Sequence, residues 1–492
     1  MPRDVRPRTE PRAASAQSLK KHEKTEAQWE RDAGSGRLEM LEGNRAMTSE
    51  STISPPASTV ALARRAGLAS LVGTTIEWYD YFIFGTASAL VFGRLFFPGE
   101  DPITGTLASF AVFGVGFVAR PLGGMVFGHL GDKFGRKGVL VTTLMITGLS
   151  TMLIGFLPTY TAIGIWAPIL LVLLRLIQGF GVGGEWGGAS LVAVEYAPPG
   201  KRGLYGSLPQ VGNGIGVVLA TGVFTVVSLL PDDALFSWGW RVPFIASALL
   251  VVVGAFIRLQ LAETPAFLAA KEAAESSRAE QTAMERPLKT LVRDYRKPLF
   301  LAMGVKLAEG AYGYIVLTFL VAYATTYTEL PRGSVLLATT LAGAGSVVTF
   351  FLVGALSDRV GRRQLVMIGA FVGVVMAFPF FWLLNMNSVP LMFLGVLVTY
   401  LCGNGVIYAV QSSFFSEMFD TSVRYSGISL AYQLPSILVG AIPFAATAMV
   451  AATDGAAYPV SLMLICTSLL GFFCAYFTKD ARDRQLDVDQ FS

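Results

Sequence analysis

The sequence Gly128-His-Leu-Gly-Asp132-Lys-Phe-Gly135-Arg136-Lys137 returns later in the chain as Gly354-Ala-Leu-Ser-Asp358-Arg-Val-Gly361-Arg362-Arg363. In both copies two glycines, an aspartate and three basic residues occupy the same positions. Two further pairs of stretches correspond: 195–202 with 417–424, and 181–183 with 403–405. Three matches at corresponding positions indicate that the chain contains a duplicated unit.

The composition around these repeats is that of a membrane protein. Of the 492 residues, 53% are hydrophobic and 15% are charged, and the mean hydropathy is +0.55. A soluble chain carries about a quarter charged residues, so a cytosolic enzyme is excluded. Apolar stretches of roughly twenty residues recur, which is long enough to cross a bilayer as a helix. Twelve spans are predicted, at 68–93, 104–130, 138–157, 163–192, 203–230, 239–261, 299–326, 333–356, 364–384, 389–413, 426–451 and 456–478.

The repeat divides these spans equally. We therefore expect an all-α membrane protein with twelve transmembrane helices in two pseudo-symmetric six-helix bundles. The expected parts are a disordered N-terminal tail (1–60), a first bundle (61–262), a linker (263–297), a second bundle (298–478) and a C-terminal tail (479–492). Most basic loop residues fall on one side, so the positive-inside rule predicts an inner-membrane protein with both termini in the cytoplasm.

Several classes of function find no support in the sequence. A net charge of +4 without a basic patch argues against nucleic acid as a partner. The three cysteines have no metal-ligand spacing and only two histidines exist, so no metal site is expected. No phosphate-binding loop or hydrolase motif is present, so we expect neither a cofactor nor an enzyme. The lipid bilayer is the partner that the composition predicts, and a monomer is expected.

The repeated loop resembles the G-xxx-D-[RK]-x-G-x-[RK] loop of the major facilitator superfamily. Four stretches resemble those of the metabolite:proton symporters within this superfamily: Glu77-Trp-Tyr-Asp80, Arg120-Pro-Leu-Gly-Gly, 178–188 and 238–244. The stretch 416–433 is most similar to the shikimate branch of these symporters. The resemblance covers about residues 65–480. It implies a secondary active transporter that imports a small organic acid by proton symport with alternating access.

Charged residues inside spanning helices are costly and mark a pathway or a pair by default. Four acids lie at this depth (Glu77, Asp80, Glu185 and Glu309) against three bases (Arg120, Arg175 and Lys306). If all are ionised, one negative charge is in surplus, which is a natural place for a transported proton. Asp80 is the first candidate for the proton carrier and Glu77, one helical turn before it, is the second.

The same charged residues are candidates for binding the substrate. Arg120 and Arg175 suit a carboxylate, because a guanidinium can bind it with two hydrogen bonds. Lys306 and Glu309 would be the contribution of the second half. The other expected substrate contacts are Glu185, Tyr79, Gln210, Asn213, Tyr312 and Gln411. For each of these groups, a helix-to-helix contact without any ligand remains the alternative.

The repeated loops predict a conformational latch. Acids and bases recur at corresponding positions of both halves: Asp132, Arg136, Asp358, Arg362, Glu195, Arg202, Glu417 and Arg424. Ion pairs among them would hold the cytoplasmic side closed and break when the transporter opens inward. The alternative is that Gly135 and Gly361 simply allow a tight turn.

The sequence motifs are compatible with more than one function. A symporter for zwitterions of the proline or betaine type, and a facilitator without proton coupling, both fit the same motifs. A membrane sensor built on a transporter fold belongs to a different class. The substrate itself is not determined by the sequence.

Overall fold

In the computed structural model the described residues are 57–99, 101–134, 136–183, 185–195, 197–198, 200–259, 291–420 and 423–479. The expected N-terminal tail up to residue 56, the linker over 260–290 and the C-terminal tail from 480 onward lie outside these ranges. The described residues from 61 onward form one compact unit. All regular secondary structure in the described part of the chain is helical.

The first half supplies six spans, several of which are built from consecutive helices. The first span joins α2 (Ala57–Ala87), the π-helix η1 (Ser88–Phe92) and α3 (Gly93–Phe96). It is followed by α4 (Pro102–Phe134), α5 (Arg136–Phe156), the short α6 (Tyr160–Ile163), α7 (Trp166–Val182) with α8 (Glu185–Glu195), α9 (Arg202–Gly206) with α10 (Leu208–Val227), and α11 (Asp232–Ala234) with η2 (Leu235–Gly239) and α12 (Arg241–Leu259).

The second half repeats this order after the linker. Its first span joins α15 (Arg296–Tyr314), η4 (Ile315–Phe319) and α16 (Leu320–Tyr327). It is followed by α17 (Arg332–Val360), α18 (Arg362–Asn385), α19 (Val389–Leu397) with η5 (Val398–Asn404) and α20 (Gly405–Met418), α21 (Arg424–Gly440) with α22 (Ile442–Ala451), and α23 (Tyr458–Tyr476).

The expected twelve spans are confirmed. Among the described residues, eight helices are long and apolar enough to cross a membrane, and the bent pair of η2 and α12 makes a ninth. The shorter apolar helices Val141–Phe156 and Trp166–Val182 add two more. The remaining span is α2, which carries Glu77 and Asp80 in its apolar sequence.

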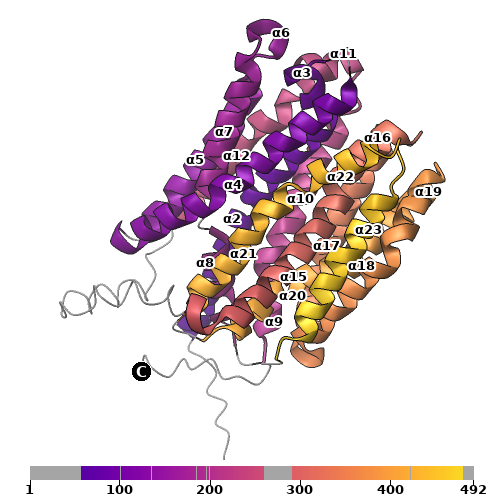
Figure 1. Ribbon diagram of the computed structural model, residues 1–492. Helices are drawn as coiled ribbons and strands as arrows, with labels where there is room; N and C mark the ends of the chain where they lie inside the picture. The colour runs from indigo at the N-terminus through magenta and orange to yellow at the C-terminus, as the bar shows by residue number, and fades with distance from the viewer. Residues whose placement is uncertain are drawn as a thin grey trace, which may run out of the picture. The chain divides into compact units, whose positions relative to one another are not determined.

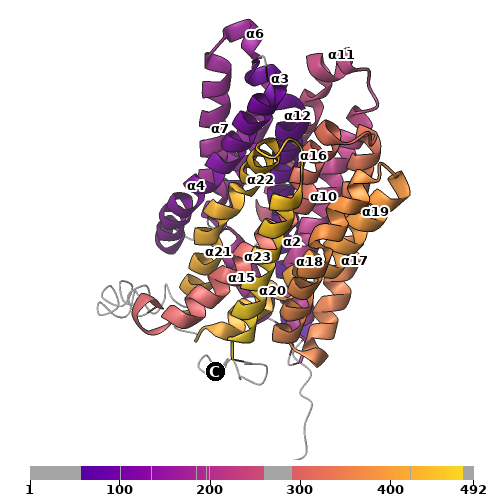
Figure 2. The same ribbon diagram turned by 45° about the vertical axis from the view of Figure 1, so that its right-hand side comes forward.

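The two halves meet along a long interface. The first-half helix α10 packs along α17 of the second half, and α4 packs against α21 and α22. Helices α8 and α9 pack against α20. In both ribbon views the indigo-to-pink helices and the orange-to-yellow helices form two neighbouring groups that contact each other through these elements (Figure 1 and Figure 2).

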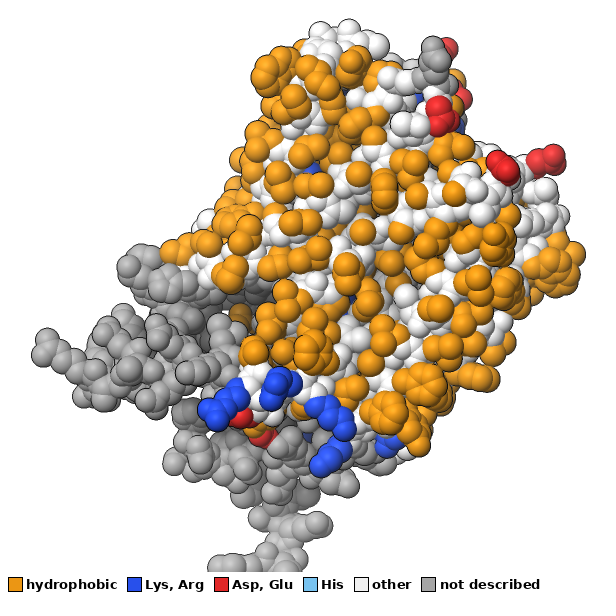
Figure 3. All heavy atoms as spheres, viewed as in Figure 1, with side chains coloured by type: hydrophobic (Ala, Val, Ile, Leu, Met, Phe, Trp, Pro, Cys, Tyr) orange, Lys and Arg blue, Asp and Glu red, His pale blue; other side chains and the backbone are white. Residues whose placement is uncertain are grey.

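The visible face of the protein is largely hydrophobic (Figure 3). Large side chains such as Leu249, Phe371 and Trp382 are more than half exposed, at 69%, 59% and 63%. Exposed apolar area of this extent fits contact with lipid rather than water. In the same view basic side chains gather at one end and acidic side chains at the other (Figure 3).

Within the first half, α4 and α7 approach each other through glycines. A side-chain carbon at Gly179 would collide with the carbonyl oxygen of Gly116 on the facing helix. Backbones can come this close only where neither residue has a bulky side chain, a packing mode common in membrane helices.

This close approach predicts the effect of a single methyl group. Gly179→Ala should prevent normal packing of α4 on α7 and lower the yield of monodisperse protein in size-exclusion chromatography severely. Gly188→Ala is the matched control, because no heavy atom lies within 4 Å of the carbon that it would add. A Gly179→Ala variant as monodisperse and heat-stable as Gly188→Ala would contradict the proposed importance of this crossing.

Candidate functional site

A buried cavity lies between the two halves. Its lining comes from α2 and α10 of the first half and from α15, η4, η5 and α20 of the second half. The lining residues are Trp78, Phe82, Asn213, Lys306, Glu309, Gly310, Gly313, Tyr314, Leu317, Tyr400, Asn404 and Tyr408. The free space has room for only about one or two water molecules, so a metabolite can enter only when the halves move apart.

An ion pair on α15 dominates the chemistry of this cavity. Lys306 Nζ lies 2.6 Å from Glu309 Oε2, and the two side chains are 3% and 7% exposed. Their spacing of three residues places them on one face of the helix. The ammonium group also lies 4.0 Å from the ring centre of Tyr432 and 5.7 Å from that of Tyr408. A buried cation between aromatic rings is well placed to receive a carboxylate.

Polar groups without hydrogen bonds also line the cavity. Asn213 Oδ1, the hydroxyl of Tyr314 and the indole Nε1 of Trp78 are buried and have no hydrogen-bond partner. By contrast, Asn404 Nδ2 donates to the backbone carbonyl oxygen of Glu309 over 2.8 Å. Buried polar groups are normally satisfied, so these three unpartnered ones are candidates for contact with a ligand or water.

Two π-helices shape the second-half wall of the cavity. Tyr400 and Asn404 belong to η5 (Val398–Asn404), and Leu317 belongs to η4 (Ile315–Phe319). A π-helix shifts the side chains that follow it around the helix axis, and such segments are frequent at functional sites. Here the shift brings the end of η5 beside Glu309.

A second buried ion pair lies in the first half. Arg120 Nη2 is 3.4 Å from Glu77 Oε1, and Arg120 Nε donates to the hydroxyl of Tyr81 over 2.6 Å. The guanidinium also lies 4.0 Å from the centre of the Tyr81 ring. Both Arg120 and Glu77 act electrostatically on Lys306, so the ion pairs of the two halves lie near each other.

The other buried arginine and acid of the first half, Arg175 and Asp80, do not form an ion pair with each other. Arg175 donates to Gln178 Oε1 over 2.5 Å and to the carbonyl oxygen of Phe113 over 3.3 Å, and both acceptors are neutral. Asp80 is completely buried, and neither of its carboxylate oxygens has a hydrogen-bond partner. The neighbouring hydroxyl of Thr151 already donates to the carbonyl oxygen of Thr147 over 2.9 Å.

Several expected substrate contacts do not line the cavity in this closed state. Tyr79 donates to the carbonyl oxygen of Pro243, and Tyr312 donates to that of Thr399. Gln210 Nε2 donates to Ser412 Oγ over 2.5 Å, which links the two halves. Arg120, Arg175 and Gln411 are buried but are absent from the lining. The side chain of Glu185 lies outside the described part of the structure. Of the expected contacts, the cavity brings together Lys306, Glu309 and Asn213.

At the end of the bundle that carries the repeated loops, acids and bases connect the two halves. Asp358 accepts hydrogen bonds from the backbone N–H groups of Gly203 (2.8 Å) and Leu204 (3.1 Å) at the start of α9. It also forms an ion pair of 2.7 Å with Arg362. A carboxylate at a helix N-terminus satisfies free N–H groups and complements the helix dipole.

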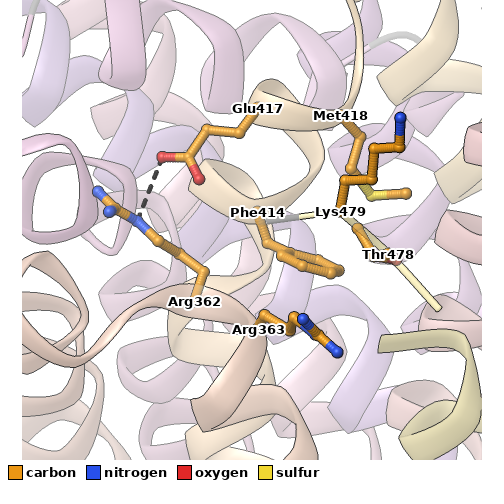
Figure 4. Close-up of a pocket in the computed structure, with 7 residues that line it drawn as sticks. All are labelled: Arg362, Arg363, Phe414, Glu417, Met418, Thr478 and Lys479. Atoms are coloured by element: carbon orange, nitrogen blue, oxygen red, sulfur yellow. Dashed lines mark ion pairs between the residues drawn. The ribbon is translucent and has the colours of Figure 1, made fainter. Parts of the chain in front are cut away.

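Two further ion pairs belong to this group. Arg362 Nε lies 3.2 Å from Glu417 Oε1, as the dashed line in Figure 4 shows. Arg424 Nη1 lies 3.5 Å from Glu195 Oε1 and connects the second half to the first. The side chains of the first-repeat residues Asp132 and Arg136 lie outside the described part of the structure.

The opposite end of the interface is also closed. Arg332 Nη2 lies 3.0 Å from Asp232 Oδ1, and the hydroxyl of Thr340 donates to that of Thr221 over 2.9 Å. Each pair joins a residue of the first half to one of the second. All side chains that line the cavity are buried, so in this closed state the cavity is largely shielded from solvent.

Sequence reasoning missed three of the aromatic residues in the lining. Trp78, Phe82 and Tyr400 were not among the expected contacts, although Trp78 stands between Glu77 and Asp80 in the sequence. The spacing of four between Trp78 and Phe82 places both rings on one face of α2, where they stack with centroids 5.7 Å apart. That periodicity was an available signal, whereas the π-helix that positions Tyr400 has none.

Comparisons with known proteins agree with this architecture. The family model described as "Sugar (and other) transporter" matches residues 66–487. The "Shikimate transporter" of Escherichia coli (strain K12) is 41% identical over 435 residues, which cover 87% of this chain and 98% of that protein. The "Proline/betaine transporter" of the same strain is 35% identical over 426 residues, covering 86% and 85%. A crystal structure of a "D-xylose-proton symporter" covers 85% of this chain and 98% of its own, at 17% identity and a TM-score of 0.66. The chain therefore belongs to the Sugar (and other) transporter family of the major facilitator superfamily and is a multi-pass membrane transporter, not an enzyme.

Proposed function

We propose that the protein is a proton symporter that imports a small carboxylate metabolite. The observation that carries this proposal is the occluded cavity between the halves, lined by the buried Lys306–Glu309 ion pair and by aromatic rings. Lys306 is the cation that receives the substrate carboxylate. The relatives named for shikimate and for proline or betaine also carry carboxylate-containing molecules, which supports this class of substrate.

The buried charges supply a reason for proton coupling. Among the described side chains at this depth, three acids (Glu77, Asp80, Glu309) face three bases (Arg120, Arg175, Lys306). The surplus acid expected from the sequence would be Glu185, whose side chain is outside the described part. A carboxyl group with the burial of Asp80 and without hydrogen bonds is favoured in its neutral form. Neutral Asp80 leaves one positive charge in surplus, which the substrate carboxylate then balances.

This charge balance gives the proposed order of events. Asp80 takes a proton from the outer side, the anion then binds at Lys306, and the cavity closes. When the inner side opens, water reaches Asp80 and both the proton and the substrate leave. One proton accompanies one monoanion, so the loaded and the empty cavity carry the same net charge.

The ion pairs around Asp358 and Arg424 would form the cytoplasmic latch. The positive-inside rule supports this orientation, because basic side chains gather at one end of the visible face (Figure 3), and the exposed Lys201 and Arg359 directly precede α9 and follow Asp358 in the sequence. Both termini would then be cytoplasmic. Opening inward requires the start of α9 to leave Asp358, so the latch has two states.

If Asp358 holds the latch closed, the variant Asp358→Ala should lose local stability at the start of α9. Loss of the carboxylate leaves two N–H groups of α9 without their acceptor, which costs about 0.5–2 kcal/mol. Hydrogen exchange measured by mass spectrometry should become up to about 30-fold faster at 203–204. Asp358→Asn, which keeps a side-chain acceptor, should show a smaller change. Unchanged exchange in Asp358→Ala would remove the capping interaction from the mechanism.

Uptake into proteoliposomes tests the function itself. With an acidic exterior, the purified protein should concentrate a labelled carboxylate such as shikimate inside, and a protonophore should abolish the accumulation. Protein-free liposomes control for passive entry of the neutral acid. A facilitator would equilibrate the substrate without concentrating it, and a sensor would transport nothing, so either result would overturn the proposal.

A zwitterion symporter is the second candidate. The aromatic rings of Trp78, Tyr408 and Tyr432 lie around the cavity and around Lys306. Such rings hold a quaternary ammonium group by cation–π contact. Competition of glycine betaine and proline against labelled shikimate distinguishes the two candidates. Inhibition by betaine at lower concentration than by unlabelled shikimate would favour the zwitterion.

A further inference from the structure

A second pocket lies in the second half, where α18 begins and where α20 and α23 end (Figure 4). It shares no lining residue with the cavity between the halves. The lining residues are Arg362, Arg363, Phe414, Glu417, Met418, Thr478 and Lys479. Because three of these side chains are cations and one is an acid, the pocket carries an excess of positive charge.

Two of the three cations have no acidic partner among the described residues. Arg362 Nε lies 3.2 Å from Oε1 of Glu417, the acid of the pocket. Arg363 instead donates from Nη2 to the backbone carbonyl oxygen of Tyr476 over 2.7 Å, and its Nε is buried without a hydrogen-bond partner. Lys479 is exposed. The positive charges of Arg363 and Lys479 are therefore available to an anion.

The position of the arginines in their helix makes an anion more favourable still. Arg362 and Arg363 are the first two residues of α18, and no acidic residue lies in its first turn. The N-terminus of a helix carries a partial positive charge, which stabilises anions and repels cations. An anion beside Arg363 offsets both this repulsion and the repulsion between the two neighbouring guanidinium groups.

Aromatic side chains place the pocket at the level of the membrane surface. Phe473, Tyr476 and Phe477 at the end of α23 are 50%, 51% and 57% exposed. The guanidinium of Arg363 lies 5.4 Å from the ring centre of Tyr476. In membrane proteins, exposed aromatic rings next to basic residues are typical of the boundary between hydrocarbon and water.

An apolar surface continues from the pocket along the helices. On α18 the residues Ile368, Phe371 and Val375 are 51%, 59% and 51% exposed, and their spacings of three and four place them on one face. Helix α18 packs along α23, which carries the exposed aromatic residues. A free phosphate ion would contact the cations alone. A phospholipid also uses the apolar surface, so the surroundings favour a lipid as the ligand.

We propose that Arg363 and Lys479 bind the phosphate of an anionic phospholipid in the adjacent leaflet, whose acyl chains lie against α18 and α23. Two cations without an acid favour a headgroup with net negative charge over a zwitterionic one. Lys479 contributes through its flexible four-carbon stem, which lets the ammonium group turn toward an anion beside Arg363.

The bound lipid stabilises the closed latch. Arg362 lies in the same turn of α18 as Arg363 and forms an ion pair of 2.7 Å with Asp358. Asp358 in turn accepts hydrogen bonds from the N–H groups of Gly203 and Leu204. A lipid that holds the first turn of α18 in place keeps Arg362 against Asp358, and so favours the state that is closed at this end.

Lipid binding to the purified full-length protein tests the proposal. Native mass spectrometry compares the retention of phosphatidylglycerol with that of phosphatidylcholine, both with palmitoyl and oleoyl chains. The wild type should retain phosphatidylglycerol preferentially. The double variant Arg363→Gln with Lys479→Gln should bind it about 30-fold more weakly, the product of about 5-fold for each cation.

The matched control is Lys201→Gln with Arg296→Gln, which removes two exposed positive charges outside the pocket. It should retain the wild-type affinity, and equal affinities of the two double variants would overturn the proposal. If Arg363→Gln does not fold, Lys479→Gln alone decides. This exposed position after α23 allows the change without disturbing packing, and the affinity should fall about 5-fold.

Two further results would contradict a lipid site. An excess of inorganic phosphate should leave phosphatidylglycerol bound to the wild type; displacement by phosphate would show a simple anion site. Equal retention of the two lipids by the wild type would also overturn the proposal, and the four aspartates of 480–492 would then be the next candidate for the anion.

Hydrogen exchange tests the connection to the latch. Exchange at 203–204 should be slower in nanodiscs of phosphatidylglycerol than in nanodiscs of phosphatidylcholine, and the double variant at Arg363 and Lys479 should lose this difference. Equal exchange of the wild type in both lipids would refute the effect on the latch. These measurements use neither substrate nor a pH difference, so a failure of the proposed transport leaves their outcome unaffected.

Discussion

Asp80→Asn should lose the ability to concentrate substrate while retaining exchange. With an exterior one pH unit more acidic than the interior, coupling of one proton to one monoanion gives about 10-fold accumulation, since one unit corresponds to about 1.36 kcal/mol. Asparagine is nearly isosteric with neutral aspartic acid but cannot release or take up a proton. The accumulation ratio in the variant should therefore fall to about 1, the value of passive equilibration.

Exchange of labelled for unlabelled substrate at equal pH is the control measurement for Asp80→Asn. It requires the cavity to open and close but no net proton movement, so it should persist. Glu77→Gln tests the second candidate for the proton carrier in the same assay. Wild-type accumulation in Asp80→Asn would exclude Asp80 as the carrier, and loss of both accumulation and exchange would indicate a structural role instead.

Lys306→Met should have the largest effect on both binding and stability. The substitution removes the only cation that lines the cavity among the described residues, so carboxylate binding should weaken by at least about 100-fold. It also leaves Glu309 buried without its 2.6 Å partner. Breaking a buried ion pair from one side costs about 3–5 kcal/mol, which thermal unfolding of the purified protein will detect.

The double variant Lys306→Met with Glu309→Gln separates the two effects. Because no uncompensated charge remains in the cavity, most of the lost thermal stability should return. Binding should not return, since the cation that receives the carboxylate is still absent. Recovery of uptake by the double variant would show that Lys306 acts only as the structural partner of Glu309.

The fold was predictable from local features of the chain. Hydrophobic length predicts each span without knowledge of its neighbours, because the bilayer requires about twenty apolar residues in a helix. The repeat around Asp132 and Asp358 predicts the two halves. Among the described helices, Val141–Phe156 and Trp166–Val182 are shorter than a usual span, and α2 carries Glu77 and Asp80 within its apolar sequence.

The site was predictable only in part. The spacing of Lys306 and Glu309 within one helix already indicates a pair, and the structure shows that pair. Gln178 stands at the same spacing of three residues after Arg175 on one helix, so that contact was also indicated. The contact between Arg175 and the carbonyl oxygen of Phe113 was not predictable, because Phe113 lies on another helix and nothing in the sequence indicates that the two meet. The same holds for Trp78, Phe82 and Tyr400, which look in the sequence like ordinary packing residues.

The amino-acid sequence by itself determined the membrane class, the duplicated helical bundles and the set of charged residues held at membrane depth. The hydrophobic length of a span and the spacing of the charged residues within it are properties of one stretch of chain, so they can be recognised in the sequence. Only the tertiary structure decided which of those charges meet. It places Lys306 and Glu309 on the closed cavity, keeps Arg175 among neutral acceptors and joins Asp358 to the start of α9. Such contacts depend on how side chains far apart in the chain fill a shared interior, which no local pattern encodes.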